Sequence, residues 1–250
     1  MDIAVETHGL TRRFGDLVAV DHLDLTVPSG SFYGFLGPNG AGKSTTLKCL
    51  TGLLKPSSGS MLILGRDPAH AGLEIKRETG VVPEEEALFE RLTAGETLSF
   101  VGRVHGLDGA TLQQRTGELL ELLDLAGSAE KLVADYSHGM RKKLAMAVAL
   151  LPAPRLLFLD EPFEGIDAVA SRQIKDILSG FVRRGGTVLL TSHILEIVER
   201  VADHVGIIDH GRLVAQGRLA DVAAGRTLED AFIALVGDGA VDKPALEWLA

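Results

Sequence analysis

The sequence is poor in the features that mark secreted or membrane-spanning proteins. It holds one cysteine, Cys49, among 250 residues, so no disulfide can form within the chain and a reducing compartment is compatible with it. Because Cys49 lies among apolar residues, we interpret it as a small core residue. The longest uncharged stretch without loop character, Leu144 to Leu151, falls far short of the roughly 18 apolar residues that span a bilayer. We therefore expect a chain that does not cross a membrane by itself.

A secretory signal and an excess of basic residues are also missing. Residues Met1 to Glu6 show neither the basic segment nor the apolar core of such a signal, which predicts a cytoplasmic protein. The formal net charge is −9 and the sequence pI is about 5.4. Nucleic-acid-binding surfaces are normally basic, so no nucleic-acid partner is expected, although local basic patches remain compatible with this charge.

The chain does contain an alternation of short apolar runs with helical patterns. This alternation predicts parallel strands joined by helices, and hence an α/β core. From about Leu92 to Leu151 the apolar spacing is helical throughout, which predicts a helical lobe inserted into that core. A terminal helix is predicted from Thr227 to Val236, packed by default, with a partner-binding face as the alternative. The strand candidates are Leu17–Val27, Ser31–Leu36, Ser60–Leu64, Leu156–Leu159, Thr187–Thr191 and His204–Asp209, and the helix candidates are 43–54, 169–184 and 194–202.

The most informative segment fits the phosphate-binding loop (P-loop) pattern G-x-x-x-x-G-K-[ST] in full. Its glycines let backbone N–H groups surround a phosphate, Lys43 adds a positive charge near the β- and γ-phosphates, and the Ser44 hydroxyl can ligate Mg²⁺. The helix predicted from Lys43 points its positive end at the same anion. The sequence therefore predicts binding of a nucleoside triphosphate. The candidate binding residues are Gly37, Pro38, Asn39, Gly40, Ala41, Gly42, Lys43, Ser44 and Thr45.

A pair of carboxylates, Asp160 and Glu161, ends the apolar run that begins at Leu156. In a phosphoryl-transfer site, a strand of this kind places the first acid where it can hold Mg²⁺, directly or through a water. The second acid is then placed to orient or deprotonate the attacking water. Two acids after a strand are weak evidence alone, but together with the P-loop they predict catalysis.

Ser137 is suited to cap the helix that runs from it towards Leu151. Three cations, Arg141, Lys142 and Lys143, stand in the first turns of that helix, where the helix dipole disfavours positive charge. A nearby anion would remove this conflict. A P-loop phosphate of the same chain and a phosphate bound by a partner are both candidates, and the sequence does not choose between them.

Taken together, these motifs resemble the nucleotide-binding subunit of an ATP-binding cassette (ABC) transporter over residues 3 to 236, in the branch that powers bacterial exporters. Tyr136–Met140 resembles the family's signature motif, Glu164–Asp167 its D-loop and Thr191–His193 its switch histidine. Phe14 stands where the family stacks an aromatic side chain on adenine.

The resemblance implies an α/β fold: a P-loop NTPase core of the RecA-like type with an N-terminal antiparallel β subdomain and an inserted helical subdomain. It implies one ABC ATPase domain over residues 1–236, followed by a helical tail over 227–250. The core would comprise residues 1–91 and 152–225, and the helical subdomain 92–151.

The resemblance also implies an ATPase on the cytoplasmic face of a membrane that powers export through a separate transmembrane permease. Two such subunits, identical or different, would close head to tail on ATP. Ser44 and Asp160 would hold Mg²⁺, Glu161 would be the general base and His193 would sense the γ-phosphate. The residues expected to contact the ATP of the partner are Ser137, His138, Gly139, Met140 and Asp167.

Two positions depart from the family pattern. Glu84 stands where glutamine is usual after Pro83, and an ionised glutamate can only accept hydrogen bonds, whereas glutamine can also donate. Glu84 is a tentative Mg²⁺ ligand that either tunes hydrolysis or its coupling to a membrane partner, or is a tolerated substitution. His138 replaces a glycine in the signature motif and either donates to a γ-phosphate or faces solvent.

Two other functions compete with transport. A soluble ABC ATPase acting on nucleic acid or the ribosome usually shows tandem cassettes, a coiled-coil insertion or basic extensions, none of which is visible in the sequence. The other function is a regulatory nucleotide-binding module without turnover. It is disfavoured by the intact Lys43, Asp160, Glu161 and His193, whereas the unusual Glu84 leaves it as an alternative.

Overall fold

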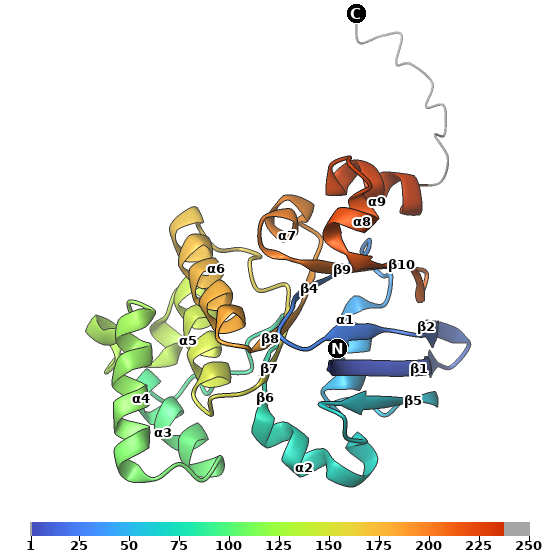
Figure 1. Cartoon of the computed structure of the whole chain (residues 1–250). Helices are drawn as coiled ribbons and strands as arrows, with labels where there is room; N and C mark the ends of the chain where they lie inside the picture. The colour runs from blue at the N-terminus through green and yellow to red at the C-terminus, as the bar shows by residue number, and fades with distance from the viewer. Residues whose placement is uncertain (1, 238–250) are drawn as a thin grey trace, which may run out of the picture.

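The computed structural model describes residues 2–237, so the part of the predicted tail beyond residue 237 lies outside the described residues. Its centre is a six-stranded sheet in the order β10-β9-β4-β8-β7-β6 (Figure 1). All neighbours in this sheet are parallel except the edge pair β9 and β10. The strands are β4 (Phe32–Leu36), β6 (Thr79–Val82), β7 (Leu156–Asp160), β8 (Thr187–Ser192), β9 (His204–Asp209) and β10 (Arg212–Arg218).

A second, antiparallel sheet is built around the long strand β1 (Ile3–Phe14), which pairs with β2 (Leu17–Leu23), β3 (Thr26–Pro28) and β5 (Ser58–Ile63). The prediction of one strand over Leu17–Val27 was wrong, because Asp24 and Leu25 separate two strands that pair with different parts of β1. β1 itself was not predicted, since charged and polar residues interrupt its apolar ones.

The two faces of the central sheet bury different layers. Phe35, Phe158 and Leu189 pack towards the antiparallel sheet and α1 (Lys43–Leu50), whereas Leu36, Leu157 and Leu190 pack towards helices on the other face. This alternation follows from the two-residue period of a strand. The helices on that second face include α6 (Ala168–Arg183), α7 (Leu195–Val201) and α9 (Leu228–Val236).

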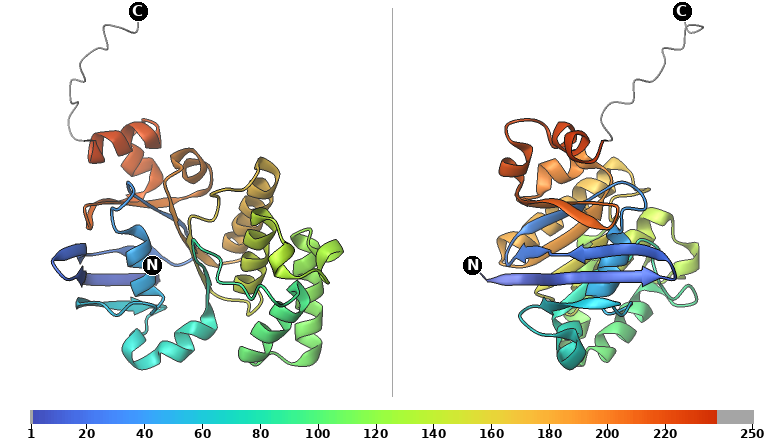
Figure 2. Two further views of the ribbon diagram at one scale, coloured as in Figure 1. Left: turned by 180° about the vertical axis from the view of Figure 1, so that it is seen from behind. Right: turned by 90° about the vertical axis from the view of Figure 1, so that its right-hand side faces the viewer.

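A helical part lies at the far side of the central sheet from the antiparallel sheet (Figure 2). It comprises α3 (Ala94–Val104), α4 (Gly109–Leu122), two 3₁₀ turns, η1 (Ala126–Ser128) and η2 (Val133–Asp135), and α5 (His138–Leu150). Leu144 and Ala147 of α5 belong to the apolar cluster of this part, but Ala145 and Met146 belong to that of the central sheet. α5 therefore bridges the two, and the division of the chain at residues 92 and 151 stays a prediction.

The structure also contains elements that the sequence patterns did not single out. These are the helices α2 (Pro68–Glu78) and α8 (Leu219–Ala223) and the strands β1, β6 and β10. In β10, half-buried residues alternate with exposed ones, as expected for an edge strand, but its arginines and glycine mask the pattern. By contrast, α1, α6, α7 and α9 begin within one residue of their predicted starts.

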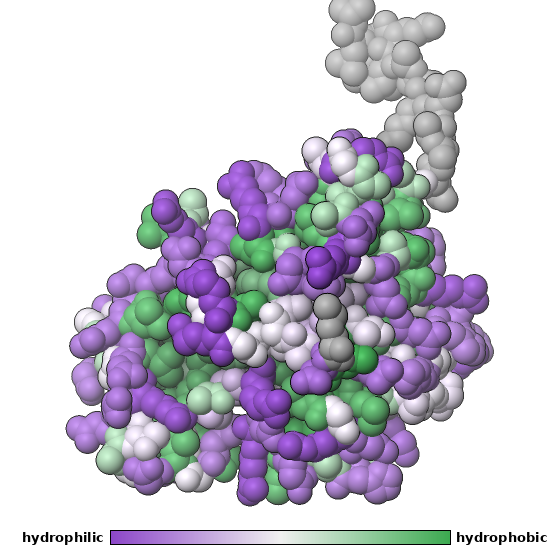
Figure 3. Space-filling view, in the orientation of Figure 1, coloured by the Kyte–Doolittle hydropathy of each residue, from purple (hydrophilic) through white to green (hydrophobic). Residues whose placement is uncertain are grey.

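On the face shown in Figure 3, hydrophobic residues lie in separate groups between hydrophilic ones. Within residues 2–237, none of the helices has the length and apolar character needed to span a bilayer.

Candidate functional site

The candidate site lies where parallel strands of the central sheet end. β4, β8 and β7 are neighbours, and their register pairs Leu36 with Ser192 and Asp160 with Thr191. The P-loop follows β4, so strand pairing brings Asp160 and Thr191 to the loop, although they are distant in the sequence. The carboxyl ends of parallel strands are the usual place for ligands in open α/β sheets.

Two glycines of the P-loop are required by close backbone approaches. Gly42 has a φ of 109°, and a Cβ there would lie 2.4 Å from the Ala19 carbonyl oxygen. A Cβ on Gly37 would lie 2.3 Å from the carbonyl oxygen of Ile208. Neighbouring strands thus hold the loop in place, and no larger residue fits at either position without a shift.

Lys43 opens α1, and its side chain is 7% exposed. Its Nζ donates to the carbonyl oxygens of Gly37 at 2.8 Å and Pro38 at 3.3 Å, and lies 3.9 Å from Glu161 Oε1. The ammonium is therefore placed inside the loop, beside the N–H groups at the start of α1 that have no intrahelical acceptor. This arrangement is suited to a phosphate.

Ser44 and Asp160 form a pair of oxygen donors. Ser44 Oγ donates to Asp160 Oδ1 at 3.1 Å, and Asp160 is nearly buried. Hydroxyl and carboxylate oxygens are ligands that Mg²⁺ accepts, usually with phosphates and waters completing the octahedron. The pair fits that ion, although residues 2–237 contain no group of three or more His, Cys, Asp or Glu side chains arranged to hold a metal.

Glu161 occupies a left-handed backbone conformation with a φ of 47°. Its Oε2 lies 3.0 Å from His193 Nδ1 and accepts a 3.3 Å hydrogen bond from the backbone N–H of His193. The side chain of His193 is 43% exposed, whereas that of Glu161 is 8% exposed. The pair places a buried carboxylate beside a solvent-accessible imidazole at the edge of the loop.

One cavity of about 510 Å³ collects most of the predicted residues. It is lined by Phe14, Leu17, Ala19, Asn39, Gly40, Gly42, Lys43, Ser44, Thr45, Glu84, Glu161, Glu164 and His193. Gly37, Pro38, Ala41 and Asp160 do not line it. The Arg12 guanidinium stands 4.4 Å from the centre of the Phe14 ring, so a cation covers one face of that ring.

Glu84 lies at the wall of this cavity, exposed, and no hydrogen bond or ion pair to it forms within the described residues. It also lines a second, adjoining cavity together with Asp160. Glu84 therefore shares one cavity with Ser44 and another with Asp160, and its role stays a prediction.

Of the predicted signature and D-loop segments, only Glu164 lines the P-loop cavity, and the residues expected to contact the partner's ATP do not: Ser137, His138, Gly139, Met140 and Asp167. Ser137 caps α5 by accepting from the Met140 N–H at 3.3 Å, and Gly139 has open space where a Cβ would stand. Asp167 caps α6 by accepting from the N–H groups of Ala170 and Val169, and these hydrogen bonds, that from Ala170 foremost, lower the pKa of its carboxyl.

His138 contacts its own chain at two points. Its Nε2 lies 3.4 Å from the Glu164 carbonyl oxygen, and its Nδ1 lies 3.8 Å from Glu86 Oε2. The side chain is 50% exposed. The His138 ring therefore faces solvent on one side. On the other side it contacts the segments that contain Glu86 and Glu164.

The three cations at the start of α5 have carboxylate partners in their own chain. Arg141 lies 3.9 Å from Glu90, Lys142 lies 3.6 Å from Glu86, and Lys143 lies 3.5 Å from Asp124. Neither of the phosphates considered from the sequence is needed to compensate them.

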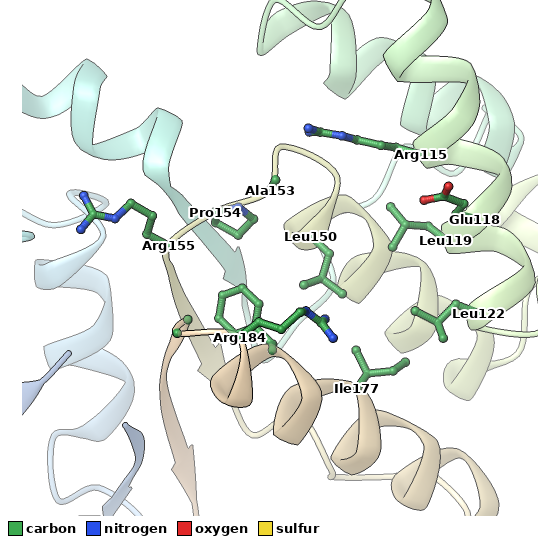
Figure 4. Close-up of a pocket in the computed structure, with 13 residues that line it drawn as sticks. Arg115, Glu118, Leu119, Leu122, Leu150, Ala153, Pro154, Arg155, Ile177 and Arg184 are labelled. Atoms are coloured by element: carbon green, nitrogen blue, oxygen red, sulfur yellow. The ribbon is translucent and has the colours of Figure 1, made fainter. Parts of the chain in front are cut away.

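Another cavity, of about 580 Å³, lies between α4, α6 and the turn before β7 (Figure 4). Leu119 and Ile177 form part of its apolar wall, and Arg115 and Arg184 also line it. None of the predicted nucleotide-site residues lines it, so we assign the site to the P-loop cavity.

Sequence reasoning missed three contributions to this site. The Thr191 hydroxyl donates to Asp160 Oδ1 at 2.5 Å and accepts from the Glu161 N–H at 3.1 Å. Lys142 Nζ donates to the Glu161 carbonyl oxygen at 3.0 Å. Glu86 contacts Lys142. The one available signal was that Lys142 stands between two other cations, Arg141 and Lys143, near the start of a helix.

Fold and site together define a P-loop nucleoside triphosphatase. Comparison with known proteins narrows this class: residues 20–164 match the family described as ABC transporter. The chain belongs to that family and is an ABC ATP-binding domain, whose general activity is ATP hydrolysis coupled to transport.

Individual relatives agree with this assignment. The chain is 40% identical over 219 residues to the daunorubicin/doxorubicin resistance ATP-binding protein DrrA of Streptomyces peucetius, covering 88% of this chain and 66% of the relative. It is 39% identical to the Nod factor export ATP-binding protein I of Cupriavidus metallidurans, covering 87% and 72%. A solved structure described as the ATP-binding subunit of an ABC transporter matches with a TM-score of 0.87 and 30% identity, covering 93% of this chain and 99% of that one. The chain thus spans about two thirds of the length of these two sequence relatives.

Proposed function

We propose that this chain hydrolyses ATP to power export through a separate transmembrane partner, and that two nucleotide-binding subunits close head to tail on ATP. One observation carries the proposal: the cavity that gathers Lys43, Ser44, Glu161 and His193 excludes the signature residues, which begin a separate helix. One copy of the chain therefore supplies only part of the nucleotide site. The names of the two relatives, one concerned with drug resistance and one with export, support the direction of transport.

Each residue of the half-site has a defined task. The loop amides, Asn39 to Thr45, and Lys43 hold the phosphates, and Phe14 stacks on adenine through the face that Arg12 leaves open. Ser44 and Asp160 hold Mg²⁺, which neutralises charge on the phosphates when bound. Glu84 adds a third oxygen ligand or an outer contact to that ion.

Glu161 takes the proton of the attacking water. Its carboxylate is buried and its Oε2 is already held by the backbone and imidazole of His193, so the lone pairs of Oε1 stay directed at the phosphate side, towards Lys43. His193 Nδ1 supports the base, and its exposed ring reaches the γ-phosphate. This geometry favours turnover over a purely regulatory module.

Closure has to come from several contacts together. One helix N-terminus contributes about 0.3–1 kcal/mol, and up to about 2 when partly buried. Driving a two-state equilibrium from mostly open to mostly closed takes roughly 5.5 kcal/mol. ATP bound in both sites supplies this free energy of closure, and hydrolysis removes it. In each site the ATP is held by five residues of the opposite subunit: Ser137, His138, Gly139, Met140 and Asp167.

The dimer is tested with Glu161→Gln, which binds ATP but lacks the base. We expect sedimentation velocity to show a dimer at saturating Mg-ATP and a monomer with Mg-ADP. A variant that stays monomeric in both would contradict closure by the nucleotide alone. For transport, we expect the N-terminally tagged chain in its own host to co-purify from detergent-solubilised membranes with a chain that carries apolar spans.

A further inference from the structure

Lys142 is a buried cation next to the proposed general base. Its side chain, in the second turn of α5, is 2% exposed. Removing an ammonium from water is strongly unfavourable unless it is paired and hydrogen-bonded. Lys142 Nζ has two partners: the Glu161 carbonyl oxygen at 3.0 Å and Glu86 Oε1 at 3.6 Å.

The backbone of Glu161 needs such support. A left-handed conformation is unfavourable for a residue with a Cβ, and it persists only where the surroundings hold it. At Glu161 both peptide groups are held by side chains from other elements. The N–H donates to Thr191 Oγ1 of β8, and the carbonyl oxygen accepts from Lys142 of α5.

Glu86 compensates the charge of Lys142. It follows β6 in the same segment as Glu84, its side chain is 9% exposed, and its Oε1 has no hydrogen-bond partner. Lys142 carries three N–H donors, so it can hold the Glu161 carbonyl while it faces this carboxylate. Glu86, Lys142 and Glu161 are far apart in the sequence. Their contacts therefore bring three separate segments together at one ammonium.

We propose that Lys142 is a positioning residue for hydrolysis. It fixes the left-handed backbone of Glu161, and that backbone aims the Glu161 carboxylate at the attacking water. Glu86 keeps the ammonium in place. Because α5 also begins with Ser137, one helix presents the signature to the partner and positions the base of its own subunit. This inference rests on the proposed role of Glu161 as the general base.

The decisive variant is Glu86→Gln/Lys142→Met, which removes both buried charges together and so avoids leaving one unpaired. We expect kcat to fall 10- to 100-fold per folded molecule, since a misplacement of about 1 Å can cost a reaction about 10²-fold. The Kd for ATP should change less than twofold, because Lys142 does not line the P-loop cavity. The folded fraction is measured by circular dichroism.

Two single variants sharpen this test. Lys142→Arg keeps a donor for the Glu161 carbonyl and should recover kcat at least partly. Lys143→Met, the adjacent lysine, whose partner is Asp124, should change kcat less than twofold. A folded double variant with the wild-type kcat, or one that loses ATP affinity at unchanged kcat, overturns the inference.

Glu161→Gln separates this inference from the proposed function. If Glu161→Gln hydrolyses ATP at the wild-type rate, the base assignment fails. If it is inactive while the folded double variant is fully active, the base assignment stands and only the role of Lys142 is lost.

Discussion

The Thr191 hydroxyl donates a 2.5 Å hydrogen bond to Asp160 Oδ1 from the adjacent parallel strand. The Thr191 hydroxyl oxygen also accepts a 3.1 Å hydrogen bond from the Glu161 N–H, so one fully buried hydroxyl holds both acids of the site. Thr191 therefore links the proposed ion ligand to the proposed base.

Thr191→Val keeps the shape of the side chain and removes this hydroxyl. We expect the free energy of unfolding to fall by about 1–3 kcal/mol, because the buried N–H of Glu161 loses its acceptor and Asp160 Oδ1 keeps only the donor from Ser44. We also expect kcat for ATP to fall, with Thr191→Ser close to wild type. Urea unfolding and steady-state ATPase assays measure both. A valine variant that matches the wild type in both would show that the hydroxyl holds neither acid.

Ser137→Asp should block the dimer without disturbing α5. Aspartate is as good an N-cap as serine, so the helix start is preserved, but its charge repels a phosphate bound by the opposite subunit. In the Glu161→Gln background we expect the Mg-ATP dimer to be lost, while ATP binding by the monomer is unchanged because Ser137 lies outside the P-loop cavity. Ser137→Asn is the neutral control and should dimerise. Equal dimerisation of the Asp and Asn variants would count against contact in trans.

Glu84→Gln removes a negative charge from the wall of the nucleotide cavity. With less repulsion of the phosphates, we expect tighter ATP binding, and with a weaker ion ligand we expect half-maximal ATPase activity at a higher Mg²⁺ concentration. Both are measured by ATPase titrations at fixed ATP or fixed Mg²⁺. Unchanged values would identify Glu84 as a tolerated substitution.

Glu78 should contribute to the acid sensitivity of the fold. Hydrogen bonds from Arg66 first and Arg155 second hold the pKa of its carboxyl below the ordinary value of 4.5. A carboxyl with a lowered folded-state pKa stabilises the protein above its unfolded pKa, and this stability is lost as pH falls through the folded value.

We therefore expect Glu78→Gln to lower the melting temperature slightly at pH 7 and to flatten its decline below pH about 4.5. Glu121→Gln, which removes an exposed carboxylate of α4, should keep the wild-type slope. Melting curves followed by circular dichroism between neutral and acid pH compare the three proteins. A Glu78→Gln variant with the wild-type slope would show that the two arginines do not matter for acid unfolding.

Much of the fold could be predicted from the sequence because the strands β4, β7, β8 and β9 are continuous apolar runs, as buried parallel strands are. β1 and β10 escaped prediction because half of each strand faces away from the core and carries polar residues. The boundary of the helical part is likewise hidden, since α5 packs on both sides.

The parts of the site whose geometry is local could be predicted from the amino-acid sequence. The P-loop is one contiguous segment, and its glycines, Lys43 and the start of α1 define its shape together; Asp160 and Glu161 simply end an apolar strand. Three features depend on the folded chain: Thr191 bridges the two acids, the Lys142 ammonium joins Glu86 to the Glu161 carbonyl, and Ser137 lies outside the P-loop cavity of its own chain. These contacts join segments that are far apart in the sequence, and their distances are set by strand register and helix packing, which no local pattern encodes.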